Sequence, residues 1–299
     1  KGPHAFLIDL RARGDLTPGV TVYDMGRKTT GNDLDNAAIH FDNVRIPREA
    51  LLDRHCSVDE TSGQYALTTP GLAPFAMIGQ RLYSGRVAVA QAALSYAREL
   101  FRVTRAYADD KPIWSAATAE PSYLSKIPQL QALFTEADGS LERLERFVSR
   151  CESELTPLLH AGQPPDAQLA HAIAVAKVKA VEAATDLCWR LKQEVGSYAL
   201  MEDSGFAHLD FLLCCKFAEG DSRILMQKMA RDALKVHAAG GHASSADEAS
   251  QCDKLAAALR QAGKDKAAQA AAWDAHHTLV YELAESVIER TMREHLDEA

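Results

Sequence analysis

The apolar positions from residue 74 onward recur with the period of amphipathic α-helices. They predict a first long helix over residues 74–107, with a stripe formed by Leu82, Val89, Ala93 and Ala97. Pro128 suits the first turn of a second helix. The apolar positions of that helix step by three and four: Leu130, Leu133, Phe134, Ala137, Leu141, Leu144, Val148, Cys151 and Leu155.

Two more long helices follow. Gln163-Pro164-Pro165-Asp166 breaks the chain and caps a third helix that reaches about Val195, with apolar positions Leu169, Ile173, Ala176, Ala180, Ala184, Leu187 and Leu191. A fourth opens at the capping pair Asp221 and Ser222 and ends at Gly240-Gly241. Its apolar positions are Leu225, Met229 and Ala233. Four long amphipathic helices with short links predict a helical bundle.

The first seventy residues have a different pattern of short apolar or alternating runs. Residues 5–10, 20–23 and 37–41 predict strands, separated by turn residues such as Pro18-Gly19. So few strands leave edges and an apolar face uncovered. The chain also begins at Lys1, directly on an apolar segment. We therefore expect a fragment of a longer protein.

Residues beyond Gly241 are more polar at first. The Ser/Asp/Glu-rich residues 244–251 predict a linker, and the alanine-rich residues 254–296 predict further helix.

One carboxylate stands out by its place between two of these elements. The apolar run over residues 211–217 leads to Glu219, then to Gly220, and then to the start of the fourth helix. A lone glutamate between a hydrophobic segment and a helix start is a candidate general base. Spacing alone favours a simpler interpretation, a solvated loop carboxylate, because acidic residues are common near helix starts.

Composition narrows the classes of function. The 299 residues are 47% hydrophobic and 25% charged, which allows a sizeable core in one or two domains. The net charge of −8 argues against non-specific binding of nucleic acid. No apolar run reaches membrane-spanning length, so no membrane span is predicted.

Neither the cysteines nor the histidines predict a metal site. The six cysteines form no CxxC pair, and we expect reduced thiols, packed in the core, in an intracellular reducing compartment. His276 and His277 are adjacent and point to different sides of a predicted helix. The chain contains no Walker or GxGxxG sequence for a phosphate-binding loop.

Several motifs resemble one enzyme family. Glu219-Gly220-Asp221-Ser222, followed by an apolar helix and Ala230-Arg231, resembles the signature around the catalytic glutamate of acyl-CoA oxidases and acyl-CoA dehydrogenases. Arg86 in Ser84-Gly85-Arg86 is also similar to the oxidases. The β-rich segment resembles the middle β-domain of acyl-CoA oxidases through motifs in matching order: Gly2-Pro3-His4-Ala5-Phe6, Pro18-Gly19-Val20, Asp24-Met25-Gly26-Arg27-Lys28, Leu34-Asp35-Asn36 and Phe41-Asp42-Asn43-Val44-Arg45-Ile46-Pro47-Arg48.

The resemblance implies a mainly α fold, an acyl-CoA dehydrogenase-like antiparallel helical bundle preceded by part of a β-domain. Residues 1–70 correspond to the C-terminal part of the middle β-domain and residues 71–243 to the bundle that carries flavin and acyl-CoA chemistry. Residues 244–299 correspond to a linker and the start of an additional C-terminal helical region. That extra sequence favours the oxidase branch, since dehydrogenases of the family end soon after the glutamate helix. The family's N-terminal domain, which lines the acyl pocket, is expected to be missing.

The implied activity is FAD-dependent α,β-dehydrogenation of a fatty acyl-CoA to trans-2-enoyl-CoA, with electrons passing to oxygen. Glu219 would abstract the α-proton, and Gly220 would let backbone and substrate approach closely. Arg223 has two interpretations, a ligand of phosphate or carboxylate and a partner in a helix-surface salt bridge.

The resemblance also implies flavin contacts. Arg105 is the candidate for the arginine of the family's Arg-x-x-Phe-Gly sequence, which meets the flavin pyrophosphate across a subunit interface. The Phe and Gly are absent here, and Arg102 competes for the role. The family's Gln-x-x-Gly-Gly-x-Gly turn appears as residues 193–199, which keep Gln193 and Gly196 but have Ser197 and Ala199 at the other glycines. Such a turn implies a shifted or more weakly bound flavin. Two further candidate cofactor contacts lie after the glutamate: Asp221 and Ser222.

Two alternatives stay open. One is an acyl-CoA dehydrogenase that passes electrons to a protein acceptor, and the other is a non-catalytic relative kept as a structural or partner-binding subunit. Intact Glu219 argues against the second, and the altered glycine turn argues for it. The implied partners are a fatty acyl-CoA and further copies of the chain in a homodimer or higher homo-oligomer. The implied compartment is the peroxisome, glycosome or mitochondrion in a eukaryote, or the cytoplasm in a bacterium.

Overall fold

The computed structural model describes residues 4–68, 74–114, 122–241 and 245–297, without the side chains of residues 74–81. The Gly2-Pro3 part of the first motif and Ser244, the first residue of the predicted linker, lie outside the described residues. The chain divides into two compact units, residues 1–81 and residues 82–299. The functional division predicted from the sequence, into residues 1–70, 71–243 and 244–299, stays a prediction.

The first unit is built from short antiparallel hairpins. The pairs are β1 (Arg11–Ala12) with β2 (Asp15–Leu16), β3 (Val20–Asp24) with β4 (Ala37–Phe41), and β5 (Cys56–Val58) with β6 (Tyr65–Leu67). In the longest hairpin Val20 lies opposite Phe41 and Asp24 opposite Ala37. The strands predicted over residues 20–23 and 37–41 are therefore confirmed.

The strand predicted over residues 5–10 is wrong. This segment makes only an isolated bridge, between Phe6 and Leu51. A 3-10 turn at Arg48–Ala50 (η1) immediately precedes Leu51 and bends the partner segment, so the ladder does not extend.

An apolar face stays open on the β3–β4 hairpin. Every residue of β4 is exposed, and the large side chains of Ile39 and Phe41, which lie on the same face of the hairpin, are 44% and 47% exposed. The sequence expectation that these few strands leave an apolar face uncovered is confirmed.

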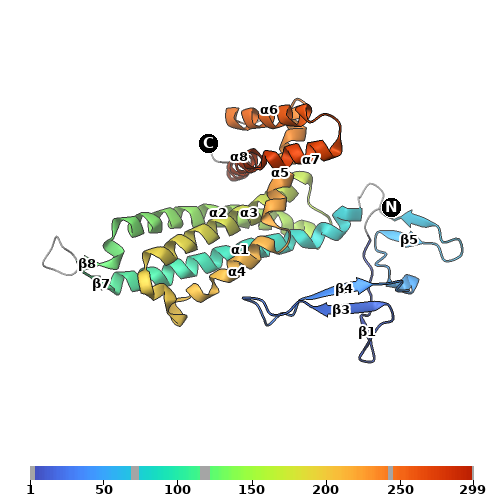
Figure 1. The fold of residues 1–299 in the computed structure, drawn as a ribbon, viewed down its shortest axis with the longest axis horizontal. Coiled ribbons are helices and arrows are strands. Elements are labelled where there is room, and N and C mark those ends of the chain that lie inside the picture. Colours follow the sequence, from blue (N-terminus) through green and yellow to red (C-terminus); the bar gives the residue numbers. More distant parts are fainter. Residues whose placement is uncertain (1–3, 69–73, 115–121, 242–244, 298–299) are drawn as a thin grey trace. The chain divides into compact units, whose positions relative to one another are not determined.

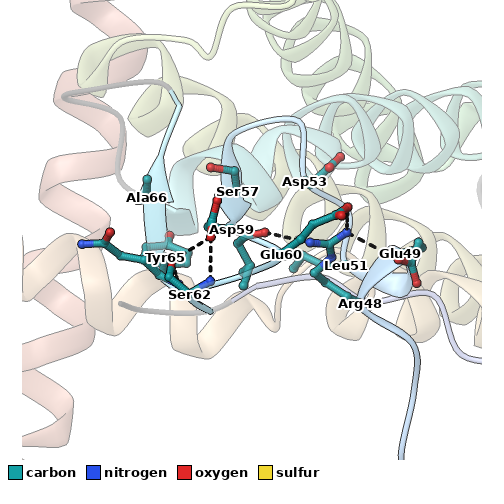
Figure 2. A pocket seen from close by; sticks show the side chains of 12 residues that line it. Arg48, Glu49, Leu51, Asp53, Ser57, Asp59, Glu60, Ser62, Tyr65 and Ala66 are labelled. Atoms are coloured by element: carbon teal, nitrogen blue, oxygen red, sulfur yellow. Dashed lines mark hydrogen bonds and ion pairs between the residues drawn. The ribbon is translucent and has the colours of Figure 1, made fainter.

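A hollow of about 910 Å³ lies beside the β5–β6 hairpin (Figure 2). Arg48 pairs there with Glu60 and Glu49, and Asp59 accepts hydrogen bonds from the backbone and hydroxyl of Ser62. These charged and polar groups satisfy one another, and none of the predicted site residues lines the hollow.

The second unit holds the helical bundle. Its first helices are α1 (Pro74–Asp110, which begins in the first unit), α2 (Pro128–His160), α3 (Ala167–Glu194), α4 (Leu209–Phe217) and α5 (Ser222–Ala238). Helices α1, α2 and α3 run side by side (Figure 1), and α3 also contacts α4 and α5. A small hairpin of β7 (Pro112–Ile113) and β8 (Ser122–Tyr123), followed by a 3-10 turn at Leu124–Lys126 (η2), precedes α2. The predicted mainly α fold is confirmed.

The core follows the predicted stripes on two helices and departs from them on a third. Every apolar position predicted for α2 and α3 is buried. On α1, Leu82 and Val89 are only half-buried, whereas Val87 and Leu94 are buried. The many alanines of α1 widen its apolar arc, so the sequence pattern does not fix the centre of the buried face.

The helix boundaries match the predicted signals closely. Pro128 opens α2, and the Asp166 carboxylate caps α3 by accepting a hydrogen bond from Leu169 N at 2.8 Å. At the end of α5, Gly240 is left-handed (φ 79°) and Gly241 N donates to Val236 O at 2.9 Å. This is the predicted glycine stop.

The link before α5 is longer than predicted. It contains three 3-10 turns, η3 (Gly196–Leu200), η4 (Glu202–Ser204) and η5 (Phe206–His208), and then α4. The predicted short link is therefore wrong, because residues 196–217 form structure of their own.

The predicted polar linker over residues 244–251 is also wrong. Helix α6 (Ala246–Gln261) begins inside it, with the Ser245 hydroxyl accepting a hydrogen bond from Glu248 N at 3.1 Å. The Glu248 side chain is buried and pairs with Arg290 at 2.9 Å, on the last helix. A serine followed three residues later by glutamate is a helix-start signal that the polar composition obscured. Two helices follow, α7 (Lys266–Ala275) and α8 (His277–Leu296), and α8 packs against α3, α5 and α6.

Four further features considered in the sequence can be compared with the structure. All six cysteines are unpaired, and four of them are buried in the core as expected, whereas Cys214 is exposed. Among the described residues, no helix has the length and apolar character to cross a membrane, and no group of three or more His, Cys, Asp or Glu side chains could hold a metal ion. His276 and His277 lie at the junction of α7 and α8 rather than within one helix.

Candidate active site

Glu219 lies in a short turn between α4 and α5, in an unusual backbone conformation. Its φ is 56° and that of Gly220 is 105°, so two consecutive residues are left-handed. A non-glycine residue in this region costs on the order of 1–3 kcal/mol and persists where its surroundings hold it. Such strain is concentrated at functional sites, and the contacts of this turn show what holds it.

The Glu219 carboxylate rests on α1, at Gly85. A Cβ placed on Gly85 would lie 2.3 Å from Glu219 Cδ and 2.5 and 2.7 Å from its two carboxylate oxygens. Any larger residue at position 85 would occupy the space of the carboxylate. The missing side chain of Gly85 therefore creates the seat of the predicted base.

Arg86, the next residue of α1, holds the backbone of the same turn. Its Nε donates to the carbonyl oxygen of Glu219 at 2.9 Å, and its guanidinium lies 5.9 Å from the centre of the Tyr83 ring. Burial lowers the pKa of Arg86, while Tyr83 and Glu219 act in the opposite direction. An arginine stays charged under such a shift, so it brings a fixed positive charge to Glu219.

Lys177, on α3, holds the other side of the turn. Its side chain is fully buried, and Nζ donates to Lys216 O at 2.8 Å, Gly220 O at 2.9 Å and Ser222 Oγ at 3.0 Å. The chain entering the turn, the turn itself and the start of α5 are thus tied to one amine. Burial lowers the pKa of Lys177 to about 8.

The residues that open α5 have partners of their own. The Asp221 carboxylate caps the helix by accepting hydrogen bonds from Arg223 N at 2.8 Å and Ile224 N at 3.2 Å. Ser222 is buried against Lys177. Arg223 lies over the Tyr281 ring at 4.8 Å, a cation–π contact in place of the salt bridge that was one interpretation, and its role as a ligand of phosphate or carboxylate stays a prediction. The flavin contacts assigned to Asp221 and Ser222 stay predictions.

The remaining predicted cofactor residues gather elsewhere, near the C-terminal ends of α1 and α3. Tyr107 stacks on Tyr198 with ring centres 3.7 Å apart, which joins the end of α1 to the turn that follows α3. Arg105 lies on this part of α1, and the turn contains left-handed Gly196 (φ 59°) and exposed Ser197.

The polar groups of this second cluster are partly engaged. Arg105 pairs with Asp138 at 2.7 Å and lies over the Phe134 ring at 4.5 Å, while Arg102 pairs with Glu99 on its own helix. Gln193 Nε2 donates to a backbone carbonyl one helical turn earlier, at 3.1 Å. Arg105 thus contacts α2 and Arg102 contacts its own helix, and the choice between them for the flavin contact stays a prediction.

The two clusters of predicted residues are far apart within one chain. Gly85 and Arg105 are twenty residues apart on one helix, and a rise of 1.5 Å per residue separates them by about 30 Å. The structure thus brings Glu219, Gly220 and Ser222 together at one end of α1. Arg105, Gln193, Gly196 and Ser197 gather near the other end.

Sequence reasoning missed Lys177 and the steric role of Gly85. A signal for Lys177 existed, because this lysine follows Ile173 by four residues and so lies on the apolar stripe of α3. A lone amine on a buried helix face needs acceptors from elsewhere in the fold. The sequence does not say which acceptors these are.

Comparison with known proteins agrees with this architecture. The family model described as "Acyl-CoA dehydrogenase, C-terminal domain" matches residues 75–234. The chain belongs to this family. The matched span runs from α1 into α5 and contains all the predicted site residues.

Similar sequences are acyl-CoA oxidases, which confirms the predicted resemblance. Over 257 residues the chain is 26% identical to acyl-coenzyme A oxidase 2 of Candida tropicalis, covering 79% of this chain and 34% of that protein. Over 66 residues it is 50% identical to the mouse acyl-coenzyme A oxidase-like protein (22% and 10%). Over 82 residues it is 40% identical to peroxisomal acyl-coenzyme A oxidase 1 of Dictyostelium discoideum (27% and 12%).

Solved structures share the fold. An acyl-CoA oxidase from tomato superposes with a TM-score of 0.77 at 18% identity, over 99% of this chain and 51% of the other. An acyl-CoA oxidase-2 from Caenorhabditis elegans, bound with FAD, ascaroside-CoA and ATP, gives 0.77 at 15% identity, over 99% and 50%. The chain spans about half the length of these structures.

Proposed function

We propose that this chain is part of an FAD-dependent acyl-CoA oxidase that converts a fatty acyl-CoA to its trans-2-enoyl-CoA and passes the electrons to oxygen. The observation that carries the proposal is the seating of the Glu219 carboxylate on Gly85, with its backbone held by Arg86. A base whose backbone is held in this way needs less ordering before it meets a substrate α-carbon. The family and the oxidase relatives support the same chemistry.

In the proposed reaction Glu219 accepts the α-proton of the acyl thioester. Arg86 orients the base through its carbonyl, and the left-handed backbone at Glu219 and Gly220 sets the direction of the peptide between them. Gly220 carries no side chain, so a substrate can approach this peptide closely.

The second cluster fits the pyrophosphate end of FAD. Gly196 is left-handed, a Cβ placed on it would meet no atom within 4 Å, and Ser197 is exposed, so a ligand has room at this turn. Arg105, near the same end of α1, would add a positive charge that is partly neutralised by Asp138. When bound, FAD supplies the acceptor for the hydride that leaves the β-carbon.

The distance between the clusters supports a homodimer or higher homo-oligomer. About 30 Å of α1 separates Gly85 from Arg105, so we infer that Glu219 and Arg105 of one chain serve different flavins. The names of the oxidase relatives favour the peroxisome among the compartments considered.

A non-catalytic relative is the second candidate, and the Arg105–Asp138 ion pair favours it together with the two replaced glycines. In that case the bundle would serve as a structural or partner-binding subunit.

The deciding experiment is the visible absorption spectrum of the intact protein that contains this chain. A flavin band that bleaches anaerobically with an acyl-CoA and returns in air is the expected result. Glu219→Gln should keep the band but slow bleaching by about 100- to 10,000-fold. A protein that stays colourless after addition of FAD would favour the non-catalytic relative. Bleaching that returns only with an added protein acceptor would favour a dehydrogenase.

A further inference from the structure

All three N–H donors of the Lys177 ammonium can be used in hydrogen bonds to the segment around Glu219. An ammonium has three N–H donors, and Nζ has three acceptors within 3.0 Å: Lys216 O, Gly220 O and Ser222 Oγ. The side chain is 0% exposed. A buried charge with every donor used is costly to place and effective in fixing its partners.

The three acceptors bracket the predicted base on both sides. Lys216 lies in the last turn of α4, Gly220 follows Glu219 directly, and Ser222 begins α5. Lys216 is also held by its own amine, which pairs with Glu182 of α3 at 2.8 Å. The segment of chain that carries Glu219 is thereby tied to α3, while Arg86 ties it to α1.

We propose that Lys177 is a positioning residue that holds Glu219 and Gly220 in their left-handed conformation and so keeps the Glu219 carboxylate on Gly85. The inference rests on the proposed function for its effect on turnover. Among the described residues, Lys177 makes no hydrogen bond or ion pair with the carboxylate; it acts through the Gly220 carbonyl, as Arg86 acts through the Glu219 carbonyl.

Charged and titratable groups from four helices act on the Lys177 amine. Asp221 at the start of α5, Cys215 on α4 and Glu182 on α3 favour its charged form, and Arg86 on α1 opposes it. Burial outweighs the favourable groups and lowers the pKa of Lys177 to about 8. At neutral pH the amine is thus mostly an ammonium with all three donors, and it loses one donor above that pKa.

The test replaces Lys177 by methionine, which keeps the length of the side chain and removes its donors. Lys179→Met is the matched control, because Lys179 lies two residues further along α3 and pairs with Glu285 instead. Both variants are made in the intact protein that contains this chain. Amide hydrogen exchange of residues 216–222 reports the turn, and anaerobic flavin reduction by an acyl-CoA reports the base.

For Lys177→Met we expect exchange in residues 216–222 to rise about tenfold or more. We expect the limiting rate of flavin reduction to fall by about 100-fold, with acyl-CoA affinity changed less than about threefold. The alkaline fall in rate near pH 8 should disappear. Lys179→Met should leave exchange in the turn and the reduction rate as they are.

If Lys177→Met does not fold, Ser222→Ala tests the proposal instead. This change removes one of the three acceptors of Lys177 and leaves its hydrogen bonds to the Lys216 and Gly220 carbonyls. Faster exchange in the turn and a reduction rate per bound flavin lowered by about three- to tenfold are expected. Unchanged exchange in either folded variant overturns the proposal. If the unaltered protein reduces no flavin with any acyl-CoA, the proposed function fails, and the exchange measurement still decides whether Lys177 holds the turn.

Discussion

The carboxylate of Glu219 occupies the space that a side chain at Gly85 would need, with only 2.3 Å between a Cβ there and Glu219 Cδ. Glycine in the interior of a helix costs about 1 kcal/mol relative to alanine. Helix α1 is otherwise rich in alanine, so its stability alone would favour a different residue at position 85. The glycine is explained by the carboxylate it accommodates.

Gly85→Ala is therefore expected to separate stability from activity. The new methyl group cannot coexist with the carboxylate in its present place, so Glu219 must move and proton abstraction should slow by about 100-fold. Anaerobic flavin reduction measures this rate, and circular dichroism checks that α1 stays folded.

The matched control is Gly139→Ala on α2, where a Cβ meets no atom within 4 Å. It should raise the free energy of unfolding by about 0.5–1 kcal/mol and leave the reduction rate unchanged. Full activity in Gly85→Ala would show that the carboxylate does not work from this position.

Arg105→Ala is expected to weaken FAD retention, because Arg105 is the proposed arginine of the flavin pyrophosphate and lies near the end of α1 that Tyr107 joins to the turn after α3. Removing one charge-assisted contact to phosphate costs about 1.5–3 kcal/mol, which is roughly 10- to 100-fold in the dissociation constant. Fluorescence titration of the apoprotein with FAD measures it. Arg102→Ala serves as the control, since Arg102 pairs with Glu99 on its own helix.

Asp138→Asn is expected to change FAD affinity in the opposite direction from Arg105→Ala. It releases Arg105 from its ion pair and should tighten FAD binding. Unchanged affinity in both Arg105→Ala and Asp138→Asn would remove Arg105 from the flavin site.

The buried amine of Lys177 predicts opposite effects of pH on stability and rate. Its pKa is lowered to about 8 in the folded state, against about 10.4 in an unfolded chain. Between these values the unfolded state binds more protons, so the free energy of unfolding should rise with pH through this window. The reduction rate should fall around pH 8, where the folded protein's ammonium loses one of its three donors.

Thermal unfolding at several pH values measures the effect on stability. The quantity to follow is the difference in free energy of unfolding between the unaltered protein and Lys177→Met. The difference should change between about pH 8 and pH 10 and be flat below pH 7. A flat difference throughout would mean that the folded state leaves the pKa of Lys177 at its ordinary value.

The sequence predicted the bundle well because its signals are local. Stripes on α2 and α3, Pro128, Asp166 and Gly240 each act within a few residues, and each lies where expected. The shifted stripe on α1 reflects its alanines, which are apolar enough for either face.

The candidate site could be predicted only in part, because its contacts join distant segments. Glu219 was found from a motif, whereas its seat at Gly85 and its tie to Lys177 depend on how α1 and α3 pack beside the turn. The segment before α5 was missed for a related reason, since its short 3-10 turns have no strong periodicity.

A shared flavin site predicts that two defective proteins restore each other. In a shared site, Glu219 comes from one subunit and Arg105 from the other. A hybrid dimer of one Glu219→Gln subunit and one Arg105→Ala subunit therefore has one flavin site that carries both changes and one that carries neither. After subunit exchange in equal amounts, about half of the dimers are hybrids with one intact site, so about a quarter of the full activity should return. The assay uses FAD at a concentration too low to load Arg105→Ala.

The control for this experiment mixes the unaltered protein with a variant that carries both changes. Every site in such a hybrid receives one altered residue, so activity should fall below the average of the two proteins. Restoration in the first mixture with loss in the second requires that the residues act across an interface. Absence of restoration, with hybrids verified by mass spectrometry, would mean that each chain holds its flavin with its own residues, in conflict with the roughly 30 Å between Gly85 and Arg105 along α1.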